Sequence, residues 1–320
     1  INTTIPQALD DGIIRHPSVA WFMASTAELL FHMGIDASKL RFRQHESTEM
    51  AHYASDCWDA EILGSYGWIE CVGIAHRGCY DLEAHENYTG QRLRAWRDWP
   101  EPVQSKRTLV TIDGSTAGPA FRSQAGAVKE ALEKMDAPPT SYPFKLTLSD
   151  SSIVEIQQEH VKIEDIDETI NGEWFTPHVV EPAFGIDRII WHLLDHAWNE
   201  EEKNGEQYSV LSLSPSVAPI DAAVLPLMEK DGMDELALNL HASLCSMNGI
   251  QSSHDASGSI GRRYARADEV GIPWCITIDH QSLDDGTATV RRRDDQKQIR
   301  CKIEDITLHI RDGKMNSLFE

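Results

Sequence analysis

Residues 199–206, Asn-Glu-Glu-Glu-Lys-Asn-Gly-Glu, separate two parts of this 320-residue chain that differ in their expected pattern of helices and strands. The run is polar and strongly charged, which is typical of a linker between domains. We therefore expect one domain over residues 1–200 and a second over residues 207–320. The upstream domain reads as α+β, and the downstream domain reads as α/β.

Downstream of the linker, expected strands alternate with expected helices. Such alternation is typical of an α/β layer built on a mostly parallel or mixed sheet. The strands are expected near 208–213, 221–227, 250–254, 273–279 and 287–292, with helices over 233–247 and 259–269.

Upstream of the linker, apolar residues at helical spacing predict a helix over 16–35 that stops at Gly34, and another over 184–198. Short strands are expected at 40–42 and 65–75, and a helix at about 46–58. Residues 90–175 read as an insertion. It carries strand candidates at 108–112, 143–147 and 152–156 and a helix candidate at 124–135.

The composition is that of a soluble globular protein, with 41% hydrophobic and 25% charged residues. No run approaches the roughly 20 apolar residues of a membrane helix, and no basic leader opens the chain, so we expect a cytoplasmic protein. The six cysteines show no C-x-x-C spacing, and we expect reduced thiols and no metal site.

The charge balance is unusual, because 51 Asp and Glu residues face 29 Lys and Arg residues, for a formal net charge of -22. A non-specific nucleic-acid binder should be basic overall, so this class is disfavoured, although a local basic patch for one structured RNA is compatible with it. Our hypothesis is that the acidity is an adaptation to a salty cytoplasm.

Glu70 is a candidate for chemistry because alternation in the expected strand places it on one face with Tyr66, Trp68 and Val72. We therefore expect its carboxylate to be at least partly desolvated, which requires a cation or several hydrogen-bond donors. Two interpretations stay open: an internal salt bridge with an arginine, or a carboxylate presented to a ligand.

A second candidate is the turn Glu-Pro-Ala-Phe-Gly-Ile-Asp-Arg at 181–188. Arg188 falls in the first turn of the following helix, where the helix dipole favours anions over cations. A phosphate bound there would satisfy both the helix start and the guanidinium, so phosphate binding is one interpretation of this segment. His192 and His196 have metal-ligand spacing, but Leu193 stands where a metalloprotease has Glu, so we expect them to serve the helix itself.

The third candidate is a basic cluster in the downstream domain. Arg262, Arg263 and Arg266 stand beside Tyr264, and Arg291 begins a second run of arginines. Arginine with an aromatic ring suits phosphate contact and base stacking on single-stranded RNA. The alternative is pairing with nearby carboxylates, namely Asp268, Glu269, Asp294 and Asp295.

Four sequence blocks together resemble eukaryotic and archaeal glycyl-tRNA synthetases, which are class II aminoacyl-tRNA synthetases. The blocks are Leu-Arg-Phe-Arg-Gln-His at 40–45 with Glu-Met-Ala-His-Tyr-Ala-Ser-Asp-Cys-Trp-Asp-Ala at 49–60, Tyr-Gly-Trp-Ile-Glu-Cys-Val-Gly at 66–73, Phe-Thr-Pro-His-Val-Val-Glu-Pro at 175–182 running into Gly185 and Arg188, and 255–266. The resemblance implies part of an antiparallel-sheet catalytic core with an insertion over about 90–172, followed by an anticodon-binding domain.

The resemblance also implies roles for single residues. Glu70, Cys71 and Arg188 would bind ATP, with Arg188 as the catalytic arginine on the nucleotide phosphates. Glycine would be bound by Glu181, Pro182 and Ala183, and tRNA by Arg262, Arg263, Arg266 and Arg291. The third glycine position is commonly Ser in the family, and Asp187 replaces a frequent Gly.

These roles imply ATP and Mg²⁺ at the site, glycine and tRNA(Gly) as substrates, and a homodimer for the full-length form. They predict that Glu70, Glu181 and Arg188 surround one cavity. Class II motifs 1 and 2 are not recognisable, and from this we expect that a segment upstream of Ile1 is missing and that the chain alone is inactive or weakly active.

Two other functions remain open at this point. One is a non-catalytic nucleic-acid-binding relative, like the processivity subunit of mitochondrial DNA polymerase. The other is a degenerate paralogue kept for regulation or scaffolding. Non-catalytic relatives tend to lose the ligand residues, whereas Glu70, Glu181 and Arg188 are all present.

Overall fold

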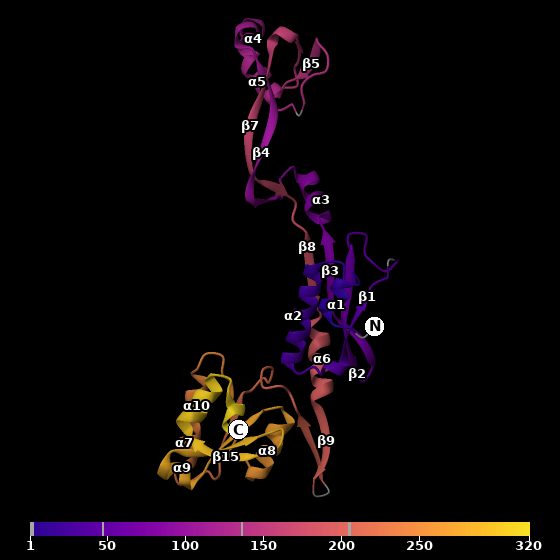
Figure 1. Ribbon diagram of the computed structural model, residues 1–320. Coiled ribbons are helices and arrows are strands. Elements are labelled where there is room, and N and C mark those ends of the chain that lie inside the picture. Colours follow the sequence, from indigo (N-terminus) through magenta and orange to yellow (C-terminus); the bar gives the residue numbers. More distant parts are fainter. Residues whose placement is uncertain (1–2, 47, 136, 204–205) are drawn as a thin grey trace. The chain divides into compact units, whose positions relative to one another are not determined.

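The computed structural model describes residues 3–46, 48–135, 137–203 and 206–320 (Figure 1). The chain forms two compact units, the first made of Ile1–Asp81 and His178–Glu320, the second of Leu82–Pro177. The expected insertion at 90–172 lies inside the second unit. The boundary that we expected near residue 200 lies within the first unit.

The first unit opens with an antiparallel sheet in the order β1-β2-β3-β8, as the resemblance implies for this part of the chain. Helices α2 and α6 pack on one face of this sheet, and their apolar residues share one core with Ile62, Val72 and Ile74. The elements are α1 (Ile5–Asp10), α2 (Pro17–Met33), β1 (Leu40–Gln44), β2 (Asp56–Gly64), β3 (Gly67–Gly78), β8 (Val179–Phe184) and α6 (Ile186–Ala197). Gly34 ends α2 in the left-handed conformation, which confirms the predicted stop.

A β-bulge at Cys71 changes the faces that we predicted for β3. Glu70 pairs with Glu61 and Val72 pairs with Ala60, so Cys71 is an extra residue of β3 with no partner position on β2. Side chains across an antiparallel pair share a face, and Val72 is fully buried, whereas Glu70 is exposed. The prediction that these two residues share a face is therefore wrong, because the bulge inverts the alternation between them.

The helix that we predicted at about 46–58 is also wrong. The described residues of this stretch form turns as far as Ser55, and strand β2 begins at Asp56. Asp56 is 1% exposed and accepts hydrogen bonds from the backbone N of Arg15, from Gln44 Nε2 and from Trp58 Nε1. A buried carboxylate with three donors holds the start of the strand, and this long-range contact outweighs the local helical spacing.

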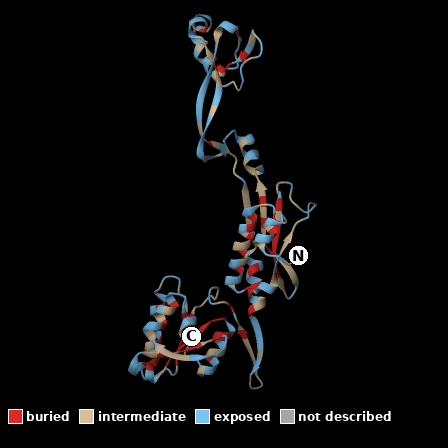
Figure 2. Cartoon of the chain, viewed as in Figure 1, coloured by how far each residue is buried: buried red, intermediate tan, exposed pale blue. Residues whose placement is uncertain are grey.

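The remainder of the first unit contains a five-stranded mixed sheet in the order β12-β11-β13-β14-β15, with the first three strands parallel and the last two antiparallel. The strands are β11 (Ala222–Pro226), β12 (Ser252–His254), β13 (Trp274–Ile278), β14 (Thr287–Arg292) and β15 (Gln298–Lys302). The helices are α7 (Met233–Cys245), α8 (Ile260–Glu269), α9 (His280–Asp285) and α10 (Ile303–Arg311). In Figure 2 the buried residues concentrate on the strands of this sheet. The mixed sheet is confirmed for four of the predicted strands, but the strand expected at 208–213 lies outside it and β15 was not predicted.

The polar run at 199–206 is part of a hairpin rather than a free linker. Strands β9 (Trp198–Lys203) and β10 (Glu206–Leu211) pair antiparallel, with Tyr208 opposite Glu201. The residues 204 and 205 of the run lie outside the described part of the chain. Val210 on β10, just beyond the run, is buried and fixes this strand on the core of the unit.

The second unit joins a long two-stranded ribbon, β4 (Ala95–Ile112) with β7 (Val161–Phe175), to a small core around Val128, Leu132 and Ile156. Its other elements are α4 (Gly114–Phe121), α5 (Ala125–Glu133), β5 (Phe144–Thr147) and β6 (Ile153–Ile156), while α3 (Tyr80–Thr89) starts in the first unit. Across all the described residues of both units, no helix has the length and apolarity to cross a bilayer.

Candidate active site

The candidate site lies on the face of the first sheet opposite α2 and α6. Asp59 on β2 pairs with Gly73 on β3, which in turn pairs with Ala183 on β8, so these three positions share that face. A Cβ atom at Gly73 would lie 3.9 Å from Glu70 Oε1, which places Glu70 there as well. We call this surface the open face.

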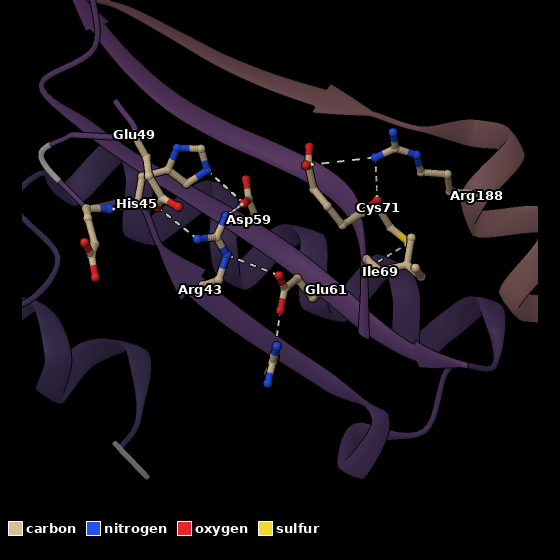
Figure 3. Close-up of polar contacts among 11 residues, drawn as sticks. Arg43, His45, Glu49, Asp59, Glu61, Ile69, Cys71 and Arg188 are labelled. Carbon is tan, nitrogen blue, oxygen red and sulfur yellow. Dashed lines mark hydrogen bonds and ion pairs between the residues drawn. The ribbon is translucent and has the colours of Figure 1, made fainter. Parts of the chain in front are cut away.

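Arg188 meets Glu70 at one end of the open face. Arg188 Nη1 donates to the carbonyl oxygen of Glu70 at 2.8 Å and lies 4.0 Å from Glu70 Oε2 (Figure 3). Both side chains are about half exposed, at 52% for Glu70 and 56% for Arg188. The carboxylate is therefore less desolvated than we expected, and an incoming ligand can reach both groups.

The first turn of α6 is held against the bulge by Gly185. Its backbone N donates to the carbonyl oxygen of Cys71 at 2.8 Å, and a Cβ atom there would lie 3.1 Å from that oxygen. The absence of a side chain at Gly185 thus allows the close approach that brings Arg188 to Glu70. His192, in the next turn, donates through Nδ1 to the carbonyl of Arg188, and His196 contacts the carbonyl of Leu63. Both histidines serve the helix and its packing.

Cys71 itself faces the core. It is 2% exposed, its Sγ lies 3.4 Å from the carbonyl of Ile69, and burial raises the pKa of its thiol to about 11. The thiol is thus protonated at neutral pH and does not face the ligand side. A contact between Cys71 and ATP, which the resemblance implies, would have to use the backbone.

Glu181 lies on the open face one strand away from Glu70. It pairs with Ala75, two residues beyond Gly73, and its carboxylate is bonded to Arg77. Burial, and then the negative charges of Asp59, Asp56, Glu70 and Glu181, raise the pKa of the Cys57 thiol to about 11. Glu70 and Glu181 thus lie on the same face of adjacent strands, whereas the hollow that Arg188 lines, with Tyr66, Ile69 and Trp191, includes neither glutamate.

The space between the glutamates has a floor of small residues. Gly73, Ala75 and Ala183 occupy neighbouring positions of β3 and β8 on the open face. Pro182 pairs with Ile74, which is fully buried, and so belongs to the opposite face. Ala183 is therefore placed to face a ligand, whereas a glycine contact at Pro182 would involve its backbone.

A row of paired charges that the sequence did not reveal borders this floor (Figure 3). Arg43 Nη2 is 2.9 Å from Asp59, its Nη1 is 3.0 Å from Glu49 and its Nε is 3.2 Å from Glu61. Arg41 Nε lies 2.6 Å from Glu61. Asp59 and Glu61 are 2% and 8% exposed, so the arginines provide the counter-charge that buried carboxylates require. Cys57, Asp59 and Glu61 alternate along β2, and this period of two is the signal for the row. We missed it because we predicted a helix over 46–58.

His45, Cys57 and Asp59 place three ligand-type atoms within 4.8 Å of one another on the same face. Asp59 Oδ2 already accepts from Arg43 and lies 2.8 Å from His45 Nε2. The raised pKa of Cys57 opposes formation of the thiolate that a soft metal needs. The arrangement fits a hydrogen-bonded ion pair better than a metal site.

In the mixed-sheet part, Arg263 and Arg291 have internal roles. Arg263 is 4% exposed and donates to the carbonyls of Pro226, Ala256, Ser257 and Gly258. Arg291 is also 4% exposed, and both of its Nη atoms lie 2.8 Å from the carboxylate of Asp268. The alternative that we considered, pairing within the protein, describes these two residues, and both are almost fully buried.

Arg266 and Arg262 are exposed on the same helix. Arg266 is bonded to Asp255 and to the carbonyl of Ser257. Arg262 lines a polar hollow of about 500 Å³ together with the side chains of Gln207, Gln298 and Tyr264. Arg291 lines the same hollow but is only 4% exposed, so of the four arginines predicted to bind tRNA, Arg262 is the exposed one beside it.

Over 311 residues, 97% of its length, the chain is 45% identical to a protein from Methanothrix thermoacetophila named "Glycine--tRNA ligase". Proteins of the same name from Methanocaldococcus jannaschii and Archaeoglobus fulgidus are 40% and 42% identical over 98% and 95% of the chain. The chain is a homologue of the glycine–tRNA ligases. It spans about half the length of these relatives, 54%, 55% and 53% respectively.

Residues 221–312 match the family model described as "Anticodon binding domain". The match covers the mixed sheet from β11 to the end of α10, with Arg262, Arg263, Arg266 and Arg291 inside it. The glycine–tRNA ligase homology extends upstream across the first sheet as well, so both the open face and the mixed sheet belong to the region of similarity. The alternative of a non-catalytic polymerase subunit is not favoured by these relatives.

Proposed function

We propose that this chain is part of a glycine–tRNA ligase, which activates glycine with ATP to glycyl-adenylate and transfers the glycyl group to the 3′ end of tRNA(Gly). The observation that carries the proposal is the contact of Arg188 with Glu70 beside the open face that bears Glu181. This contact lies in a chain similar over nearly its whole length to proteins named "Glycine--tRNA ligase".

Glycine offers only an ammonium and a carboxylate for recognition. Glu181 on the open face supplies an anionic acceptor for the ammonium, with Ala183 and Gly73 as the small residues below it. A larger amino acid would be excluded by steric walls, a form of selection that needs no editing step because the unwanted side chain does not fit.

Arg188 would hold the nucleotide phosphates, because a guanidinium can bind two phosphate oxygens at once. The glycine carboxylate then attacks the α-phosphate of ATP and pyrophosphate leaves. In such a step the protein acts by placing the reactants and by neutralising developing negative charge. This part of the chain would thus be a portion of a class II catalytic core.

Mg²⁺ would arrive with ATP as the substrate complex and would neutralise phosphate charge. Glu70 fits such a role, since Mg²⁺ prefers carboxylate oxygen and this carboxylate is half exposed. Asp59 and Glu61 fit it less well, because each is already bonded to an arginine.

For tRNA, we propose that Arg262 and the hollow beside it contact the anticodon region. The three other predicted residues would contribute indirectly, since Arg263 and Arg291 shape the domain from within and Arg266 holds Asp255. A homodimer and a cytoplasmic location complete the proposal, and sedimentation of the full-length protein tests the former.

The decisive experiment is ATP–pyrophosphate exchange with the full-length protein that contains this chain. Exchange that depends on glycine, and that alanine or serine does not support, is the expected result. A folded full-length protein that binds tRNA but shows no glycine-dependent exchange would leave the non-catalytic alternative in its place.

A further inference from the structure

The guanidinium of Arg77 joins three separate segments of the first unit beside the open face. Its Nε and Nη2 atoms lie 2.7 Å and 3.1 Å from the two carboxylate oxygens of Asp81, at the start of α3. Its Nη1 atom lies 2.5 Å from Glu181 Oε2 on β8. The ring of Tyr53, from the turns before β2, lies under the guanidinium at 3.9 Å from its centroid.

The backbone places Arg77 for these contacts. The pairing of β3 with β8 steps from His76–Val180 to Gly78–Val179, which leaves Arg77 as an extra residue in the strand. A bulge of this kind redirects the side chain of the extra residue. Arg77 therefore reaches Glu181 on the neighbouring strand although the two residues are not paired in the ladder.

Two of the contacts fix the orientation of the guanidinium before Glu181 is considered. The two-point contact with Asp81 sets its plane, and stacking on Tyr53 holds that plane from one side. The hydrogen bonds that Arg77 donates to Asp81 and Glu181 raise the pKa of Arg77 above its usual value, so it remains charged. The remaining N–H group is then a rigid donor that points at Glu181.

Glu181 needs such a donor because its side chain is 47% exposed and has three rotatable bonds. The bond from Arg77 holds one carboxylate oxygen and leaves the other to accept a hydrogen bond from a ligand. Asp81 offsets the positive charge of Arg77, so the pair beside Glu181 adds little net charge that would repel a cation.

We propose that Arg77, held by Asp81 and Tyr53, is the positioning residue that orients Glu181 toward the glycine ammonium. This inference rests on the proposed function and adds a residue to it. It assigns to the Asp81–Arg77–Glu181 chain the recognition of a free ammonium group.

The test is Arg77→Lys in the full-length protein, measured by ATP–pyrophosphate exchange. Lysine keeps the charge but loses the two-point contact and the stacking. We expect the KM for glycine to rise about tenfold to a hundredfold, the range for loss of one charge-assisted hydrogen bond. The KM for ATP should stay unchanged, and the thermal midpoint checks that the variant is folded at the assay temperature. Asp81→Asn, which leaves Arg77 in place, should raise the KM for glycine in the same direction by less.

Arg97→Lys is the matched control, because Arg97 is also bonded to a glutamate, Glu173, and also lies over an aromatic ring, Phe175, but in the second unit. It should leave both KM values unchanged. A double-mutant cycle measures whether the effect of Arg77→Lys on the KM for glycine depends on Glu181, which a merely structural role would not produce. If Arg77 acts through Glu181, Arg77→Lys should have little further effect once Glu181→Gln is present.

The possible results distinguish failure of this inference from failure of the proposed function on which it rests. A wild-type protein without glycine-dependent exchange overturns the proposed function and the inference together. Wild-type exchange combined with an unchanged KM for glycine in Arg77→Lys overturns the inference alone. Additive effects of Arg77→Lys and Glu181→Gln would do the same, since independent residues add.

Discussion

Arg188 Nη1 donates to the backbone carbonyl of Glu70 at 2.8 Å, while the Glu70 carboxylate lies 4.0 Å from the same nitrogen. The arginine is therefore placed by the backbone of the β3 bulge and is only weakly engaged by the side chain. Its other Nη group can bind phosphate without first breaking a close ion pair. The contact thus resembles a prepared ligand site more than a structural salt bridge.

Replacement of Arg188 by Ala should abolish glycine-dependent exchange without loss of stability, because exposed side chains contribute little to folding. Arg311→Ala is the matched control, since the Arg311 side chain is exposed to the same extent, 56%, far along the chain in α10. Exchange assays and thermal unfolding of both variants check this. Near-normal turnover by Arg188→Ala would refute the assigned role.

Replacement of Gly185 by Ala should lower exchange activity by displacing Arg188. The new Cβ would lie 3.1 Å from the Cys71 carbonyl, so the first turn of α6 has to shift, at an expected cost of about 1 kcal/mol in stability. Gly261→Ala is the control, because a Cβ there meets nothing within 4 Å. Equal activity of the two variants would show that this close approach does not position Arg188.

Arg262 and Arg263 are adjacent, but replacing them should affect different properties, tRNA binding for Arg262 and stability for Arg263. Arg262→Ala should weaken binding of tRNA(Gly) to this chain while the free energy of unfolding stays the same, because Arg262 is exposed. Arg263→Ala should reduce the free energy of unfolding by about 2–4 kcal/mol, since it leaves buried carbonyls without donors. Filter binding and urea unfolding measure the two effects, and a stable Arg263→Ala protein would contradict the assignment.

Stability should fall as the pH is lowered below 6.5, and His76 should contribute to that loss. Burial, and then the neighbouring His16 and His178, lower the pKa of His76 below 6.5 in the folded protein. Above pH 6.5 the ring is neutral in both states; as the pH falls below that value the unfolded chain takes up the proton first, which favours unfolding. Urea unfolding at several pH values should show a smaller pH dependence for His76→Gln. His85→Gln, at an exposed site, is the control.

Low salt should destabilise the protein if its net charge of -22 is a salt adaptation. The Debye length rises from about 3 Å at 1 M salt to about 10 Å at 0.1 M, so repulsion among carboxylates is screened less. The thermal midpoint should therefore drop between these conditions, with activity following it. An unchanged midpoint and undiminished activity at 0.1 M salt would reject the adaptation.

The sequence by itself determined the element types wherever the apolar pattern was long and regular. The helices over 17–33, 186–197, 233–245 and 260–269 and four strands of the mixed sheet, β11 to β14, follow from spacing alone. The motif at 181–188 likewise indicated a strand that turns into a helix. These features depend on neighbours within a few turns of the chain, which is the range over which a sequence pattern carries information.

Only the tertiary structure decided which charged residues face a ligand and which serve the fold. The bulge at Cys71 separated Glu70 from Val72, the buried carboxylate of Asp56 replaced an expected helix by a turn and a strand, and burial gave Arg263 and Arg291 internal roles. Each outcome depends on a contact between residues distant in the chain. A guanidinium in the sequence looks the same whether it will meet a phosphate, a carboxylate or four carbonyl groups, because its surroundings are set when the chain folds.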